Sequence, residues 1–89
     1  MYQPTETLTM ENAKPALQAG LAAIAGGQTE IDLAGLTQVD SAGVAVLLAW
    51  QRAALERKQA IAFHNPPDNL RSIAQLYGVS DFLYPKQAG

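Results

Sequence analysis

The sequence predicts a single small α/β domain built around a short central sheet. Segments with the alternating pattern of strands are separated by segments with the three-to-four-residue apolar spacing of helices, which favours parallel neighbouring strands. The length of 89 residues, with 48% apolar and 16% charged side chains, supports one hydrophobic core. We expect a strand–helix unit repeated three times, with helices packed mainly on one face of the sheet. The domain would cover residues 1–89, with a core over about 5–83 and a frayed tail over 84–89.

The individual elements follow from local patterns. Alternation of polar and apolar residues predicts a first strand over 5–10. A helix should follow, with Asn12 as its N-cap, Pro15 in its first turn and an apolar stripe that ends at Gly26. The remaining elements are predicted as strands over 30–33 and 60–63, a connector over 36–39, and helices over 42–59 and 68–77.

Composition excludes several classes of function. The formal net charge is −2, without the basic stripe that nucleic-acid binding requires. The chain has no cysteine, a single histidine (His64) and no glycine-rich phosphate loop, so we expect no metal site, no cofactor and no nucleotide hydrolysis. A Ser41–His64–Asp triad would lack the glycine-flanked turn of hydrolase nucleophiles, so no catalytic residue is expected. The longest apolar run, from Val44 to Trp50, is too short to span a bilayer, and no signal-peptide pattern is seen. The sequence predicts a cytoplasmic protein that is not an enzyme.

The segment from Val39 to Val44 carries the most information about function. A strand end leads there into a polar turn and a helix N-terminus, where Asp40 or Ser41 can accept hydrogen bonds from the first helical amides. Gly43 removes a side chain where the first turn would crowd a neighbour. One interpretation is a capped helix. The other is a functional hydroxyl, because a phosphate on Ser41 would lie at the positive end of the helix dipole.

The helix after this turn is apolar on two sides. At about 100° per residue, Val44 and Leu48 fall on one side and Val46 and Trp50 on the opposite side. Such a helix is either buried on both sides or exposes an apolar patch. A domain of this size has little second layer with which to bury it. We therefore expect an exposed patch near Ser41, with Trp50 as the anchor of a protein–protein interface.

The chain resembles the STAS domain in the runs Ile31-Asp32-Leu33, Val39-Asp40-Ser41-Ala42-Gly43-Val44 and Leu47-Leu48. In the anti-sigma factor antagonists of that family, the serine of an Asp-Ser-x-Gly turn is phosphorylated by a partner kinase, and Ser41 matches that serine. The run from Asn69 to Val79 is similar to the third helix of the MlaB group. MlaB proteins are small STAS subunits that bind the cytoplasmic ATPase MlaF of a phospholipid ABC transporter and support outer-membrane lipid asymmetry. The resemblance covers residues 5–83.

The resemblance implies a partner-binding surface. It places Ser41, Ala42, Gly43 and the start of the following helix against an MlaF-type ABC ATPase, and the apolar side with Val46 and Trp50 would extend that surface. It also implies a location peripheral to the inner membrane through this partner. The alternative is an anti-sigma factor antagonist, in which phosphorylation of Ser41 by an anti-sigma factor kinase breaks the complex.

Two departures from the family pattern bear on these expectations. STAS domains usually begin with an extra strand, which this chain is expected to lack, so its sheet would have an exposed edge. Such an edge favours homodimerisation or pairing with another chain. MlaB-like proteins often carry threonine at the position of Ser41, so this serine does not separate the two groups.

Overall fold

The computed structural model describes residues 2–4 and 6–78 of the chain. The expected tail over 84–89 and the expected end of the core at 83 lie outside these residues. The elements are, in order, β1 (Thr7–Leu8), α1 (Ala13–Ala25), β2 (Glu30–Asp32), β3 (Gln38–Val39), α2 (Ser41–Glu56), β4 (Ala62–His64) and α3 (Asp68–Leu76). The predicted α/β class is confirmed. The sequence-based prediction missed β3, which forms within the segment predicted as a connector over 36–39.

All strand pairs among the described residues are parallel. β1 pairs with β3 in the register Thr7–Gln38, and β2 pairs with β4 in the register Ile31–Phe63. The strands form two parallel two-stranded sheets, β1–β3 and β2–β4. The N-terminal segment lies between them, because Tyr2 forms an isolated bridge with Ile31 of β2 and residues 7–8 pair with β3.

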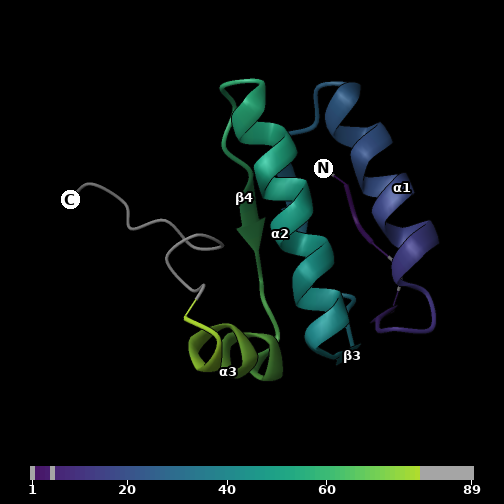
Figure 1. The fold of residues 1–89 in the computed structure, drawn as a ribbon, viewed down its shortest axis with the longest axis vertical. Coiled ribbons are helices and arrows are strands. Elements are labelled where there is room, and N and C mark those ends of the chain that lie inside the picture. Colours follow the sequence, from purple (N-terminus) through teal and green to yellow (C-terminus); the bar gives the residue numbers. More distant parts are fainter. Residues whose placement is uncertain (1, 5, 79–89) are drawn as a thin grey trace.

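The helices α1 and α2 lie side by side, and α3 packs against α2 near its N-terminal end (Figure 1). Because α1 and α2 pack against each other along their length, they form one helical layer. The core lies between this helical layer and the strands. Its most deeply buried large aliphatic side chains come from all three helices and from the strand regions, namely Leu8, Ile24, Ile31, Leu33, Leu47, Ile61 and Leu70.

The ends of α1 and α2 differ in detail from the prediction. Asn12 precedes α1, but its side chain does not cap the helix. It instead accepts a hydrogen bond from the backbone N–H of Thr9 and donates one to the carbonyl of Thr7, which braces the loop after β1. α2 ends at Glu56 rather than at 59, because Lys58 takes a φ of 60°, a left-handed conformation that a helix cannot continue through.

The short helix α3 is attached by one narrow stripe. Leu70 and Ala74 are fully buried, and Ile73 is partly buried against the core. Tyr77, the last residue of the helix predicted over 68–77, is 57% exposed. The helix ends at Leu76, and Tyr77 is its C-cap.

The contact between α1 and α2 is centred on Trp50, whose exposed fraction is 0%. Its indole N–H donates a hydrogen bond of 3.1 Å to the carbonyl of Leu17 in α1. The ring also packs edge-to-face against Tyr2, with 6.0 Å between centroids. Gly20 makes this approach possible, because a Cβ at that position would overlap the indole ring. Trp50 therefore fixes the spacing between the two helices.

Candidate partner-binding site

Asp40 caps α2 and also holds the end of β1. One carboxylate oxygen accepts a hydrogen bond of 3.0 Å from the backbone N–H of Gly43, and the other accepts one of 3.0 Å from the backbone N–H of Met10. These hydrogen bonds, that from Met10 foremost, lower the pKa of the Asp40 carboxyl because they stabilise its charged form. The predicted helix cap is confirmed, and the same side chain ties the loop before α1 to the start of α2.

Gly43 is required by packing. A Cβ at this position would overlap the backbone carbonyl of Leu8 in β1. Backbone atoms cannot rotate out of the way as a flexible side chain can, so the first turn of α2 approaches β1 closely only because this residue has no side chain. The crowding that the sequence suggested at Gly43 is real, and the neighbour is Leu8 of β1.

Ser41 is the first residue of α2, and its side chain is exposed. Both carboxylate oxygens of Asp40 accept hydrogen bonds from backbone N–H groups. The bond from Gly43 caps α2, so the Ser41 hydroxyl is not needed for the cap. Met10 is held beside this turn by its bond to Asp40 and is 79% exposed. A large apolar side chain and a hydroxyl therefore stand in solvent near the N-terminus of α2.

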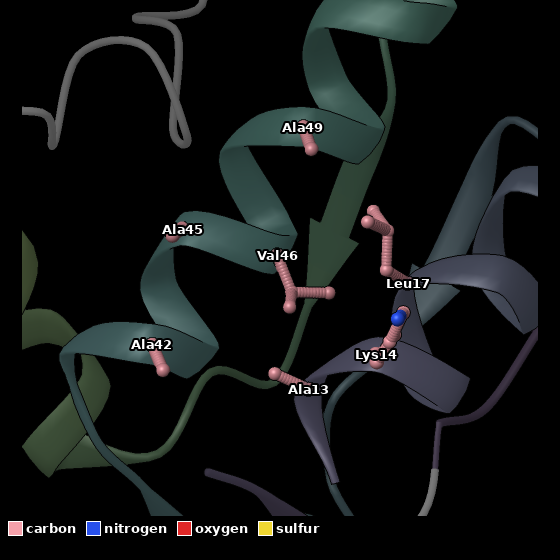
Figure 2. A pocket seen from close by; sticks show the side chains of 7 residues that line it. All are labelled: Ala13, Lys14, Leu17, Ala42, Ala45, Val46 and Ala49. Carbon is pink, nitrogen blue, oxygen red and sulfur yellow. The ribbon is translucent and has the colours of Figure 1, made fainter. Parts of the chain in front are cut away.

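An open apolar groove of about 380 Å³ runs between α1 and α2 next to this turn. Its lining comes from Ala13, Lys14 and Leu17 of α1 and from Ala42, Ala45, Val46 and Ala49 of α2. Figure 2 shows these residues on the two adjacent helices. Alanine side chains are too short to close the space between the helices, so the groove stays open. Lys14 supplies the only charge in the lining.

The expectation of an exposed patch carrying Val46 and Trp50 is wrong. Val46 is 5% exposed and Trp50 is 0% exposed. The reason is that α1 lies beside α2 in the same layer, so α2 is covered by the sheet on one side and by α1 on another. Of the residues predicted for the surface, the structure leaves Ser41 exposed and Ala42 partly exposed, and it buries Gly43.

Sequence reasoning missed other residues at this surface. Ala45 is exposed and lines the groove, and Ala49 is partly exposed. No sequence signal identifies the groove, because its two walls come from helices far apart in the chain. A weak signal existed for Met10, which is the apolar residue that ends the first alternating segment.

A separate polar network lies at the carboxyl ends of β2 and β4. Asp32 accepts hydrogen bonds from the backbone N–H of Ala34 and the side chain of Asn65, and the bond from Ala34 contributes most to lowering the pKa of this carboxyl. His64 contacts Glu30 at 3.0 Å rather than Ser41, so the described contacts assemble no catalytic triad. Within residues 2–4 and 6–78, no three acidic, histidine or cysteine side chains gather in a way that could hold a metal ion.

The fold and the turn at Asp40 define a class of protein, a small α/β module with a capped helix N-terminus beside an open apolar groove. The family model described as "Mlab, STAS domain" matches residues 5–85, so the chain belongs to the STAS domain family. STAS domains are generally interaction modules without catalytic activity. A search of curated proteins finds no match. None of the helices formed by the described residues is long and apolar enough to cross a membrane.

Proposed function

We propose that this protein is the MlaB-like subunit of a phospholipid-transporting ABC complex and that it binds the cytoplasmic ATPase of that complex. The proposal rests on the family match and on the open groove between α1 and α2 next to an exposed helix N-terminus. We call the proposed binding surface the α2 surface, and it consists of Met10, Lys14, Ser41, Ala42 and Ala45. Binding to the ATPase would hold the protein at the inner membrane.

The chemistry of the α2 surface supports a protein partner. The alanines lose no side-chain rotamer freedom on binding, so little entropy opposes their burial. Met10 offers a flexible apolar side chain that can adapt to a partner's shape. Lys14 at the edge of the groove can pair with an acidic group once the apolar contact has formed. This combination of an apolar centre and a polar edge is typical of protein–protein interfaces.

Co-expression with the MlaF-type ATPase of the same genome tests the proposal. We expect the two proteins to co-purify and to migrate together in size-exclusion chromatography. Ala45→Glu should abolish co-migration, because it places a charge in the apolar groove at an exposed position. This position is a better probe than the buried Trp50, where a charge would disrupt the core and unfold the protein.

Ala22→Glu is the matched control. Ala22 is an exposed residue of α1 outside the groove lining, so the same chemical change there should leave binding intact. Circular dichroism should show both variants to be folded. Equal binding of wild type, Ala45→Glu and Ala22→Glu would mean that the α2 surface is not the interface, and absence of any complex with the wild type would rule out the proposed partner.

We infer a second candidate function from the position of Ser41. Its hydroxyl is exposed at the N-terminus of α2 and is not needed for capping, so a kinase could modify it without unfolding the helix. A phosphate there would place about −2 charges on the α2 surface and would weaken binding, because an apolar partner would strip water from the charged group. In this reading the protein is an anti-sigma factor antagonist controlled by an anti-sigma factor kinase.

Intact-mass analysis of the protein from its native cells distinguishes the two functions. The switch predicts a singly phosphorylated species, mapped to Ser41, whose fraction changes with growth conditions. It also predicts retention of the protein by the kinase. Unmodified protein under all conditions, together with co-purification of the ATPase, would support the transporter subunit instead.

A further inference from the structure

The charged side chains of the described residues are unevenly distributed over the fold. The basic residues on α1, on α2 and in the turn that follows α2 are Lys14, Arg52, Arg57 and Lys58, and Glu56 is the one acidic residue of these described elements. The other described acidic residues lie on β2, in loops or at the start of α3, namely Glu6, Glu11, Glu30, Asp32, Asp40 and Asp68. The helical layer is therefore basic, although the whole chain has a formal net charge of −2.

Two of these cations, Lys14 and Arg52, flank the groove. Lys14 belongs to the α1 wall (Figure 2). Arg52 follows Ala45 at a spacing of seven residues and Ala49 at a spacing of three, so it lies on the same side of α2, about one turn beyond the lining. Both cations are exposed, and neither forms an ion pair with a described carboxylate, not even Arg52 with Glu56 one turn further on.

We propose that the segment of the ATPase that enters the groove is acidic, with an apolar side chain between the two helices and carboxylates that meet Lys14 and Arg52. This partner chemistry rests on the proposed function and specifies the surface that the ATPase must present. Opposite charges around an apolar contact speed encounter and exclude wrong partners. Asp40 at the start of α2 does not offset the two cations, because backbone N–H groups and the helix dipole compensate its charge.

The shape of the groove favours a protein over the other anionic surface that could attract these cations, a lipid bilayer. The groove is a hollow between two helices, so it complements a side chain that protrudes from a folded surface. Its lining is mostly alanine, whereas helices that lie on a membrane insert large side chains such as tryptophan and phenylalanine. Trp50, the only tryptophan of the chain, is fully buried.

The test measures the association rate constant of the ATPase with wild type and variants by biolayer interferometry. Salt is varied between about 0.1 M and about 1 M, which shortens the Debye length from about 10 Å to about 3 Å. We expect Lys14→Glu and Arg52→Glu each to lower the rate about tenfold at the lower salt concentration, and the difference from wild type to vanish at the higher one. Glu56→Gln removes a charge that would repel an acidic partner, so it should raise the rate.

Arg71→Glu is the matched control. It makes the same change of charge at an exposed position of α3, which lies on the side of α2 away from α1 (Figure 1), so it should lower the rate much less than Arg52→Glu. Circular dichroism should show that all these variants are folded, since the substituted positions are exposed.

The outcomes separate this inference from the proposed function. Wild-type binding at a rate that neither salt nor the two charge reversals change would overturn the acidic segment and leave the ATPase as the partner. Absence of wild-type binding would overturn the proposed function and the acidic segment with it. Co-sedimentation with phosphatidylglycerol vesicles that Lys14→Glu and Arg52→Glu abolish, with an unchanged rate of ATPase association, would assign the cations to a lipid surface and overturn the proposal.

Discussion

Substitution of Gly20 by alanine tests the packing of α1 against the buried indole of Trp50. In most helices this change is favourable by about 1 kcal/mol, because glycine is a poor helix former. Here the added Cβ would overlap the indole of Trp50, which is fully buried. The ring would have to move away from the carbonyl of Leu17 and from Tyr2, and both of its specific contacts would weaken.

The expected net effect is a loss of stability. Overfilling a packed core costs about 1–3 kcal/mol. A weakened hydrogen bond costs about 1 kcal/mol and a weakened aromatic pair about 0.5–1.5 kcal/mol. After the gain in helix propensity, we expect Gly20→Ala to lower the free energy of unfolding by about 3 kcal/mol. In a domain of this size, such a loss lowers the melting temperature by about 15 °C.

Urea denaturation followed by fluorescence measures this effect, because Trp50 is the only tryptophan in the chain. Gly35→Ala is the control: a Cβ at Gly35 would meet no atom within 4 Å, so the change should leave stability within about 0.5 kcal/mol of wild type or raise it slightly. If Gly20→Ala instead stabilised the protein as an exposed glycine-to-alanine change does, the close approach of α1 to Trp50 would be refuted.

Two further predictions concern the cap and the buried indole. Because hydrogen bonds lower the pKa of Asp40, its contribution to stability is fully present above the ordinary carboxyl pKa of about 3.9 and is lost as the pH falls through the lower folded value. The urea concentration at the unfolding midpoint should therefore decrease as the pH drops below about 4. This decrease should be smaller in Asp40→Asn, which has no carboxyl group to protonate at this position. Trp50→Phe, which removes the hydrogen bond to Leu17 and leaves a small cavity, should lower the free energy of unfolding by about 2 kcal/mol. Circular dichroism during urea titration would measure this loss, and an unchanged midpoint would show that the indole does not stabilise the helix pair.

The sequence was sufficient for the fold class because the helices and the longer strands repeat their patterns over several residues. The strand β3 was missed because its two residues, Gln38 and Val39, are too few to show alternation. Its pairing with β1 is a long-range contact that no local pattern encodes. The cap at Asp40 and the small residue at Gly43 were predictable, since both depend on the first turn of α2.

The apolar pattern of the helix could not predict whether Trp50 is buried or exposed. Two apolar sides are compatible with burial between a sheet and a neighbouring helix, and also with an exposed interface. Gly20 decides between them, because a glycine in α1 lets the indole enter. That relation joins residues 30 positions apart, and periodicity within either helix does not reveal it. The groove was missed for the same reason, since its walls meet only when α1 and α2 pack together.

Hydrogen-exchange mass spectrometry on the complex with the ATPase maps the bound surface without any substitution. If the α2 surface binds the ATPase, exchange should slow in residues 13–17 and 41–49, which contain the walls of the groove and the turn at Ser41. Exchange in residues 30–32 and 62–64 of the strands should be unaffected. Protection confined to these strands, with none in α1 or α2, would refute binding through the α2 surface and place the interface on the strands.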